Sequence, residues 1–346
     1  MFNFSILFTS IFIVILLFVS SKYIPNIVER PSETVRKIHN NSMINIGGVS
    51  FLSFFIILFY IESFEIKLIV IFSNFFLLLG LIADLNKQFL ALSRFVILTF
   101  LILIYFFISK GHIMSLTDMD YINGIFNLNL FYPIFFSTLC ILISTNSFNI
   151  IDGQHGLMLG SGILILYLFR LYIPTEHYDL VLTINGLLII SIILFLINFL
   201  SGKIKSGDCG SYFLGFSIGA LAIYINKFEY INSFHIACIL SYPAFELFFT
   251  YIRRLINKRN PFQPDHKHLH SNLFKLLKVS NQIGINKPET LNRATSLIII
   301  FFQILLQGSI YLFIGPELFL TMFFIIFIVY VALYSAIAIL LRKYST

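Results

Sequence analysis

The chain has 346 residues, of which 58% are hydrophobic and only 11% are charged, and this composition excludes an ordinary soluble globular domain. The formal net charge of +7 does not indicate a nucleic-acid partner, because the basic residues gather between apolar runs, where such residues orient a membrane protein. The sequence therefore predicts an integral membrane protein with membrane lipids, and no nucleic acid, as partners.

Apolar runs of about 20 residues, each long enough to cross about 30 Å of hydrocarbon, recur along the whole chain. They predict an all-α fold in which residues 1–346 form a single polytopic membrane domain with about 11 transmembrane helices. The predicted spans are residues 4–20, 46–63, 67–82, 92–109, 131–147, 158–173, 180–199, 211–226, 231–250, 294–314 and 317–341.

Lysine and arginine collect in alternate loops, and cytoplasmic loops are the ones expected to be basic. If the loop after the first span is cytoplasmic, 19 of the 23 basic residues lie on that side. This distribution predicts an N-terminus outside and a C-terminus in the cytoplasm. The cytoplasmic loops are then residues 21–45, 83–93, 146–158, 198–212 and 251–293.

The stretch from Asn146 to Leu157 places two carboxamides, a carboxylate and an imidazole at the end of an apolar run. In a helix, Asn146, Asn149 and Asp152 at spacing three fan over one face, and His155 follows beyond the helix end. Polar groups at membrane depth are costly unless they face protein, water or a ligand. The stretch therefore predicts a functional site, with a water-filled contact between helices as the competing interpretation.

Three carboxylates, Asp84, Asp152 and Asp208, fall on the predicted cytoplasmic face. Oxygen ligands with room for water and phosphate suit a hard divalent cation, so we expect Mg²⁺, with Mn²⁺ as the second candidate. The glycines around Asp208 would let backbone amides approach an anion closely. The candidate ligands of the metal are Asp208, Asp84 and Asp152, and the candidate diphosphate cradle comprises Lys203, Gly207, Gly210 and Ser211.

Basic and histidine side chains in the same loops could supply the positive charge that a phosphate-bearing substrate requires. The competing interpretation of each basic residue is that it only orients the protein in the membrane. His268 and His270 fit an extended loop, and without a third clustered nitrogen or thiolate they indicate phosphate contact rather than zinc. The further candidates are Arg36, Lys37, His39, Lys203 and Lys267. Together these loops predict phosphoryl chemistry between a soluble and a lipid substrate.

Four ordered blocks resemble the motifs of the polyprenyl-phosphate N-acetylhexosamine-1-phosphate transferases, and the eleven spans are more similar to the GlcNAc-1-phosphate transferase branch than to the peptidoglycan branch. The first block is Arg36-Lys37-x-His39 with Gly47-Gly48, and the second is Asn146-x-x-Asn149-x-x-Asp152-Gly153-x-x-Gly156-Leu157. The third joins Asn198 and Lys203 to Gly207-Asp208-x-Gly210-Ser211, and the fourth is Pro261-Phe-x-Pro264-Asp265-x-x-His268-x-His270.

The resemblance implies an enzyme of a bacterial inner membrane that moves a sugar-1-phosphate from a UDP-N-acetylhexosamine to undecaprenyl phosphate. UMP would be released, and the product would start a lipid-linked cell-envelope glycan, with the site on the cytoplasmic face. The sequence leaves open which sugar is used and whether the protein forms a homodimer. The implied catalytic residues are Asp84, Asp152, His268 and His270, and the implied substrate-binding residues are Arg36, Lys37, His39, Asn146, Asn149, His155, Asn198, Lys203, Gly207, Gly210, Ser211, Asp265 and Lys267.

One departure from the family pattern affects the expected chemistry. The family carries an adjacent pair of aspartates in the second inner loop, and here Ala83 stands in place of the first, which is the favoured base for the lipid phosphate. An alternative is therefore a catalytically altered or non-enzymatic membrane protein that binds or transports a phosphorylated ligand. A cation channel lined by Asp152 and Asp208 is a third interpretation, disfavoured because these carboxylates lie at one surface.

Overall fold

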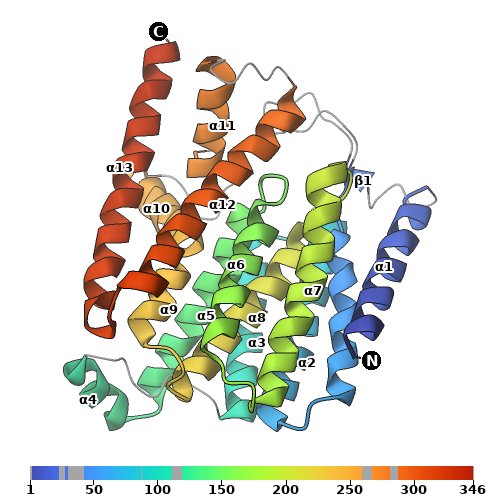
Figure 1. Cartoon of the computed structure of the whole chain (residues 1–346), viewed down its shortest axis with the longest axis vertical. Helices are drawn as coiled ribbons and strands as arrows, with labels where there is room; N and C mark the ends of the chain where they lie inside the picture. Colours follow the sequence, from blue (N-terminus) through green and yellow to red (C-terminus); the bar gives the residue numbers. More distant parts are fainter. Residues whose placement is uncertain are drawn as a thin grey trace.

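The computed structural model describes residues 2–22, 28–29, 43–86, 88–110, 119–258, 267–280 and 287–345, and it is a bundle of helices (Figure 1). The first half contains α1 (Phe2–Ser20), strands β1 (Val28–Glu29) and β2 (Met43–Ile44), the 3₁₀ helix η2 (Gly47–Phe59), α2 (Phe64–Leu85), α3 (Ala91–Ser109), α4 (Asp120–Leu128), α5 (Phe131–Ile151) and α6 (Leu157–Tyr172). The second half contains α7 (Tyr178–Ser201), α8 (Gly207–Lys227), α9 (Ser233–Ile239), α10 (Ser241–Ile256), α11 (Leu269–Ser280), α12 (Pro288–Phe313), the short 3₁₀ helix η3 (Pro316–Leu318) and α13 (Phe319–Ser345).

Each of the eleven predicted spans coincides with apolar helical structure. Among the described residues, seven helices are long and apolar enough to cross a membrane, and α9 with α10 forms an eighth candidate bent by 76°. The remaining three predicted spans correspond to shorter apolar helices, namely α1, η2 and α6. The all-α membrane fold is thus confirmed, while the number of crossings and the side of each terminus remain predictions.

Helix α8 lies in the middle of the bundle, where it packs against α2, α5 and η2 (Figure 1). Its many small residues allow neighbouring helices to approach closely, as is usual where lipid supplies no hydrophobic drive between helices. The Ser217 hydroxyl donates to Ser73 over 2.7 Å, the Ser144 hydroxyl donates to the Gly215 carbonyl over 2.7 Å, and the Phe216 ring stacks on Phe76. These contacts hold α8 in a fixed position between α2 and α5.

Glycines bring the first turn of α8 into backbone contact with two neighbours. A Cβ atom on Gly48 of η2 would lie 2.2 Å from the Gly210 nitrogen, and one on Gly80 of α2 would lie 2.4 Å from the Asp208 carbonyl oxygen. Any side chain at either position would have to push backbone apart. The start of α8 is therefore set directly by the backbones of η2 and α2.

The segment before η2 is joined to the segment before α8 by backbone hydrogen bonds. Ile44, which pairs with Val28 in the small antiparallel sheet, also forms a parallel bridge with Ile204. The Ile44 N–H donates to the Lys203 carbonyl over 2.8 Å, and the Gly47 N–H donates to the Lys205 carbonyl over 2.9 Å. Two loops distant in sequence are thus fixed side by side at the end of the bundle that also carries the α5–α6 connection and α11 (Figure 1).

Candidate active site

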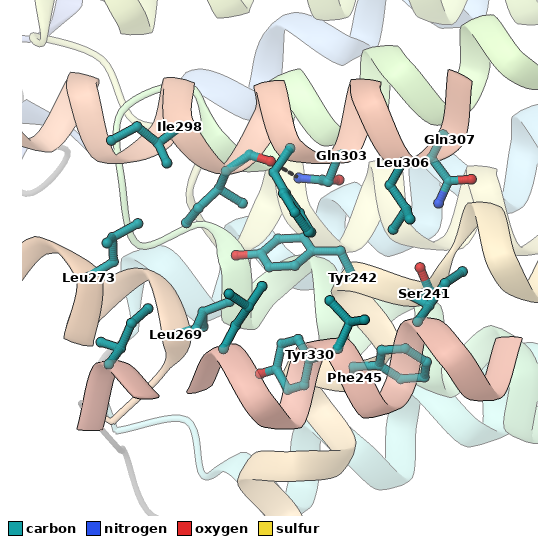
Figure 2. Close-up of a pocket in the computed structure, with 16 residues that line it drawn as sticks. Ser241, Tyr242, Phe245, Leu269, Leu273, Ile298, Gln303, Leu306, Gln307 and Tyr330 are labelled. Atoms are coloured by element: carbon teal, nitrogen blue, oxygen red, sulfur yellow. Dashed lines mark hydrogen bonds between the residues drawn. The ribbon is translucent and has the colours of Figure 1, made fainter. Parts of the chain in front are cut away.

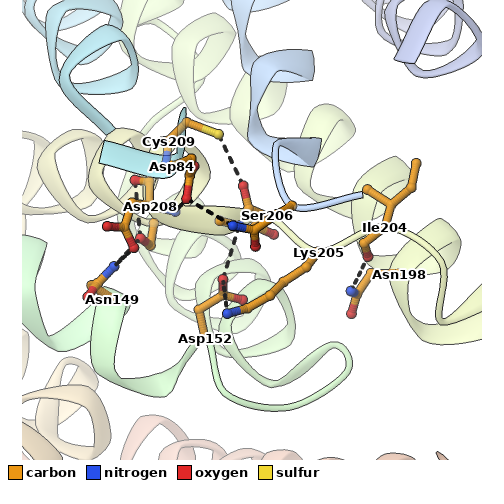
Figure 3. Close-up of polar contacts among 12 residues, drawn as sticks. Asp84, Asn149, Asp152, Asn198, Ile204, Lys205, Ser206, Asp208 and Cys209 are labelled. Atoms are coloured by element: carbon orange, nitrogen blue, oxygen red, sulfur yellow. Dashed lines mark hydrogen bonds and ion pairs between the residues drawn. The ribbon is translucent and has the colours of Figure 1, made fainter. Parts of the chain in front are cut away.

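Three predicted carboxylates and one carboxamide meet at this end of the bundle (Figure 3). Asp84 comes from the last turn of α2, Asn149 from the last turn of α5, Asp152 from just beyond α5, and Asp208 from the first turn of α8. The polar residues of separate predicted loops therefore do lie together around the start of α8.

Asp84 caps the N-terminus of α8 from the neighbouring helix. Its Oδ1 accepts the Asp208 N–H over 3.0 Å and its Oδ2 accepts the Cys209 N–H over 3.0 Å, whereas the preceding Ser206 side chain makes no capping bond. A carboxylate satisfies the free N–H groups of a helix start and complements its dipole. Gly207 has a φ of 73°, and a Cβ there would lie 2.6 Å from Oδ2 of Asp84, so this position needs glycine.

Asp208 is held by one cation and one amide. The Arg94 guanidinium donates to Oδ2 of Asp208, and the Asn149 amide donates to Oδ1 over 2.7 Å and to the Ser211 hydroxyl over 3.0 Å. The Asp208 side chain is still 26% exposed, compared with 9% for that of Asp152. Asp208 is therefore the carboxylate that a soluble ligand can reach more easily. Arg94, in the first turn of α3, was not predicted as a site residue, although its place next to the second cytoplasmic loop, near the start of the predicted span 92–109, is visible in the sequence.

Asp152 is buried beside the loop that leads into α8. Its Oδ2 accepts the Gly207 N–H over 3.2 Å and lies 3.9 Å from the Lys205 ammonium. Burial raises the pKa of Asp152 to about 7, while Lys205 opposes this shift and the Asp208 charge adds to it. The Asp152 carboxyl therefore titrates near neutral pH unless a further positive charge lies beside it.

The carboxylates differ in how well they fit a metal. Among the described residues, no three His, Cys, Asp or Glu side chains converge on a point where one ion could be held. Both Asp84 oxygens accept backbone N–H groups of α8, and both Asp208 oxygens accept from the side chains of Arg94 and Asn149, which can move aside. Asp208 is also partly exposed and offers the hard oxygen donors that Mg²⁺ prefers. The residues present thus fit a metal held mainly by Asp208, with Asp152 nearby and water or substrate oxygens as further ligands. The three-carboxylate ligand set of Asp84, Asp152 and Asp208 stays a prediction.

The loop between α5 and α6 is held by two asparagines. The Gly156 N–H donates to the Asn198 side-chain oxygen over 2.5 Å, while the Asn198 amide donates to the Ile204 carbonyl. The His155 N–H donates to the Asn292 side-chain oxygen over 2.8 Å, and its ring is buried. The oxygen and the nitrogen of the Asn198 side chain therefore join two loops to each other. Asn292 of α12 supports the same connection and was not predicted from the sequence.

The two predicted histidines pack on a buried acid. His268 and His270 stack with ring centroids 5.3 Å apart, and Glu246 of α10 lies against both rings. Glu246 was not predicted as a site residue, although a carboxylate within an apolar run is itself a signal of function.

The other predicted residues have varied surroundings. Lys203 and Lys267 are exposed at the same end of the molecule, and the Asn146 amide donates to the Leu142 carbonyl one turn earlier over 2.8 Å. Gly210 packs against η2 rather than facing open space. Arg36, Lys37, His39 and Asp265 lie outside the described residues.

An apolar pocket of about 210 Å³ lies beside the histidine segment, between α10, α11, α12 and α13 (Figure 2). Leu269 and Leu273 line it from α11, Tyr242 and Phe245 from α10, and Leu306 from α12. Leu269 stands between His268 and His270 in the chain, so the apolar pocket adjoins the polar site.

The fold and the site define a polytopic membrane protein with an acid-, amide- and histidine-lined site at one end of its helices. The family model for glycosyl transferase family 4 matches residues 66–226. The chain is 31% identical over 260 residues to a probable undecaprenyl-phosphate N-acetylglucosaminyl 1-phosphate transferase of Bacillus subtilis, covering 71% of this chain and 69% of that protein. The chain therefore belongs to glycosyl transferase family 4.

Two further relatives match shorter parts of the chain. An undecaprenyl-phosphate alpha-N-acetylglucosaminyl 1-phosphate transferase of Thermotoga maritima is 31% identical over 141 residues, which cover 40% of this chain and 42% of that protein. A phospho-N-acetylmuramoyl-pentapeptide-transferase of Dictyoglomus turgidum is 34% identical over 193 residues, covering 53% of this chain and 59% of the relative.

Proposed function

We propose that this protein transfers a sugar-1-phosphate from a UDP-N-acetylhexosamine to undecaprenyl phosphate and releases UMP. The relatives in Bacillus subtilis and Thermotoga maritima carry names for this type of reaction. The observation in the structure that carries the proposal is the meeting of Asp208, Asp152 and Asn149 at the start of α8, with Arg94 and Lys205 beside the acids. Such a site combines ligands for a cation with positive charge for phosphate.

In the proposed reaction, an oxygen of the lipid phosphate attacks the sugar-side phosphorus of the donor, and the bond from that phosphorus to the UMP oxygen breaks. Asp208 and Asp152 would hold Mg²⁺, whose charge neutralises the diphosphate. Arg94 and Lys205 lie close enough to these acids to pair with phosphate oxygens that enter the site. Positioning and charge neutralisation, rather than covalent catalysis by the protein, would supply the rate.

The absence of the usual aspartate at Ala83 is compatible with this chemistry. A phosphate monoester has a second pKa of about 6, so the lipid phosphate is largely dianionic near neutral pH and already nucleophilic. The base that the family carries at this position would then accelerate the reaction only modestly. Loss of Asp208 should cost far more than the natural alanine at position 83.

The apolar pocket beside the histidines favours a lipid acceptor. Its lining is almost wholly hydrophobic, and it lies among helices with the composition of membrane spans. An isoprenoid chain in this pocket would place its phosphate near His268 and His270.

We propose further that the protein works in the bacterial cytoplasmic membrane with its site on the cytoplasmic face.

The alternative is a protein that binds or transports a phosphorylated ligand without turnover, for which Ala83 is the supporting observation. Membership of a transferase family favours the enzyme. The deciding experiment incubates purified protein with undecaprenyl phosphate and each of several UDP-N-acetylhexosamines, with and without Mg²⁺. UMP release matched by a new sugar-diphosphate lipid is expected for one donor. If neither the parent nor Ala83→Asp releases UMP with any donor of the panel, the proposed transferase activity is refuted.

A further inference from the structure

A buried carboxylate lies in α10, where the sequence indicates only an apolar span. The Glu246 side chain is 1% exposed, and an acid removed from water in this way is costly unless it is paired or hydrogen-bonded. Its Oε1 accepts the Leu269 N–H over 3.0 Å, which fixes the first residue of α11 to α10. This single bond leaves most of the acceptor capacity of the carboxylate for other partners.

Those partners are the two histidines of the loop. Oε2 of Glu246 lies 3.5 Å from Nδ1 of His268, and Oε1 lies 3.7 Å from Nδ1 of His270, so each oxygen faces one ring. The two rings are nearly parallel, with 6° between their planes. Both therefore present the same nitrogen to the same carboxylate.

This arrangement determines where each ring carries its proton. A carboxylate can only accept hydrogen bonds, so a neutral ring facing it is favoured with the proton on Nδ1. Neither Oε2 of Glu246 nor Nδ1 of His270 makes a hydrogen bond in the part of the chain that the structure describes, so the longer contacts between Glu246 and the two rings are the polar contacts left to them. Thr250 also lies 3.1 Å from Nδ1 of His268, and its hydroxyl can accept from the same N–H. Burial lowers the pKa of His270, which favours the neutral ring, while Glu246 acts in the opposite direction.

The opposite edge of His270 faces the α5–α6 connection. A Cβ atom on Gly153 would lie 2.8 Å from Nε2 of His270, so this ring nitrogen rests against the glycine that follows Asp152. The Gln154 amide donates to the His270 carbonyl over 2.9 Å. Glu246 is thus connected through His270 to the loop that carries Asp152.

We infer that Glu246 is a positioning residue: it holds the rings of His268 and His270 with Nδ1 protonated and facing the carboxylate, so that Nε2 of His270 lies against the loop that carries Asp152. The chemical consequence is that the acceptor nitrogen of His270 lies against Gly153 and helps to fix the loop that carries Asp152 beside the proposed reaction. The role in catalysis rests on the proposed function, whereas the tautomer of the two rings does not.

The test combines Glu246→Gln, Glu246→Asp and the control Glu65→Gln with nitrogen-15 labelling of histidine. Glu65 pairs with Lys227 in another part of the bundle, so the control makes the same chemical change away from the histidines. The parent should show both rings protonated on Nδ1, with their signals assigned through His268→Ala and His270→Ala. In Glu246→Gln, an amide that can also donate should move at least one ring to the other tautomer.

The kinetic expectation is a fall in the kcat of UMP release by about 10- to 100-fold in Glu246→Gln, with the KM for the UDP-sugar unchanged, since loss of residues that orient site ligands has effects of this size. Glu246→Asp should keep the parent tautomers and recover part of the rate. Unchanged tautomers in Glu246→Gln would overturn the inference, and so would a loss of rate that follows only a lowered melting temperature. A parent that releases no UMP contradicts the proposed function, while the nitrogen-15 signals still decide the orientation of the rings.

Discussion

The capping of α8 by Asp84 makes a prediction that separates a structural role from a metal-binding role. In Asp84→Asn, the remaining carbonyl oxygen can accept only one of the two N–H groups, and the new NH₂ group opposes the other. Leaving one helix-terminal N–H without an acceptor should cost about 1–3 kcal/mol. Asp84→Ala removes both acceptors and should cost roughly twice as much by the same reasoning.

The assay is thermal unfolding of the detergent-purified protein in the presence of EDTA. Asp208→Asn is the matched control, because the Asp208 side chain pairs with Arg94 and Asn149 rather than with α8 N–H groups. We expect the melting temperature to fall in the order parent, Asp84→Asn, Asp84→Ala with all metal removed. If Asp84→Asn unfolds at the parent temperature in EDTA and differs only when Mg²⁺ is added, Asp84 is a metal ligand and the capping argument is wrong.

Three further predictions concern the site and its surroundings. Asp208→Asn should reduce UMP release by at least about 100-fold, as expected where charge neutralisation dominates, and full activity in this variant would remove the metal assignment. Gly48→Ala should destabilise the protein by about 1–3 kcal/mol through overpacking, whereas Gly308→Ala, where a Cβ meets nothing within 4 Å, should not lower the melting temperature. Leu306→Trp should fill the apolar pocket and raise the KM for undecaprenyl phosphate but not for the UDP-sugar, and an unchanged lipid KM would place the isoprenoid chain elsewhere.

Features that depend on local pattern could be predicted from the sequence. The apolar runs locate the helices because backbone in lipid must satisfy its own hydrogen bonds. The spacing of Asn149 and Asp152 placed both side chains at the same end of α5, and the structure brings them together with Asp208 as expected.

Features that depend on contacts between distant segments could not be predicted in the same way. Nothing near Asp84 in the sequence indicates that its oxygens meet the start of α8, because that contact requires α2 and α8 to pack side by side. Gly207 and Gly210 were interpreted as making room for a ligand, but the structure shows that they make room for Asp84 and η2. Glu246 was not predicted because one acidic residue hardly changes the mean hydropathy of the apolar run around it. Only the folded chain brings Glu246 to His268 and His270.

The close backbone contacts at Gly48, Gly80 and Gly210, which only glycine permits, limit how this site can change during evolution or engineering. Substitutions on this side alter the spacing of whole helices before they alter any contact with a ligand. Variation that retunes the proposed choice of sugar while keeping the fold is therefore expected on the opposite side, in the α5–α6 connection around His155. A library built to change donor preference would place its diversity there and keep these three glycines constant.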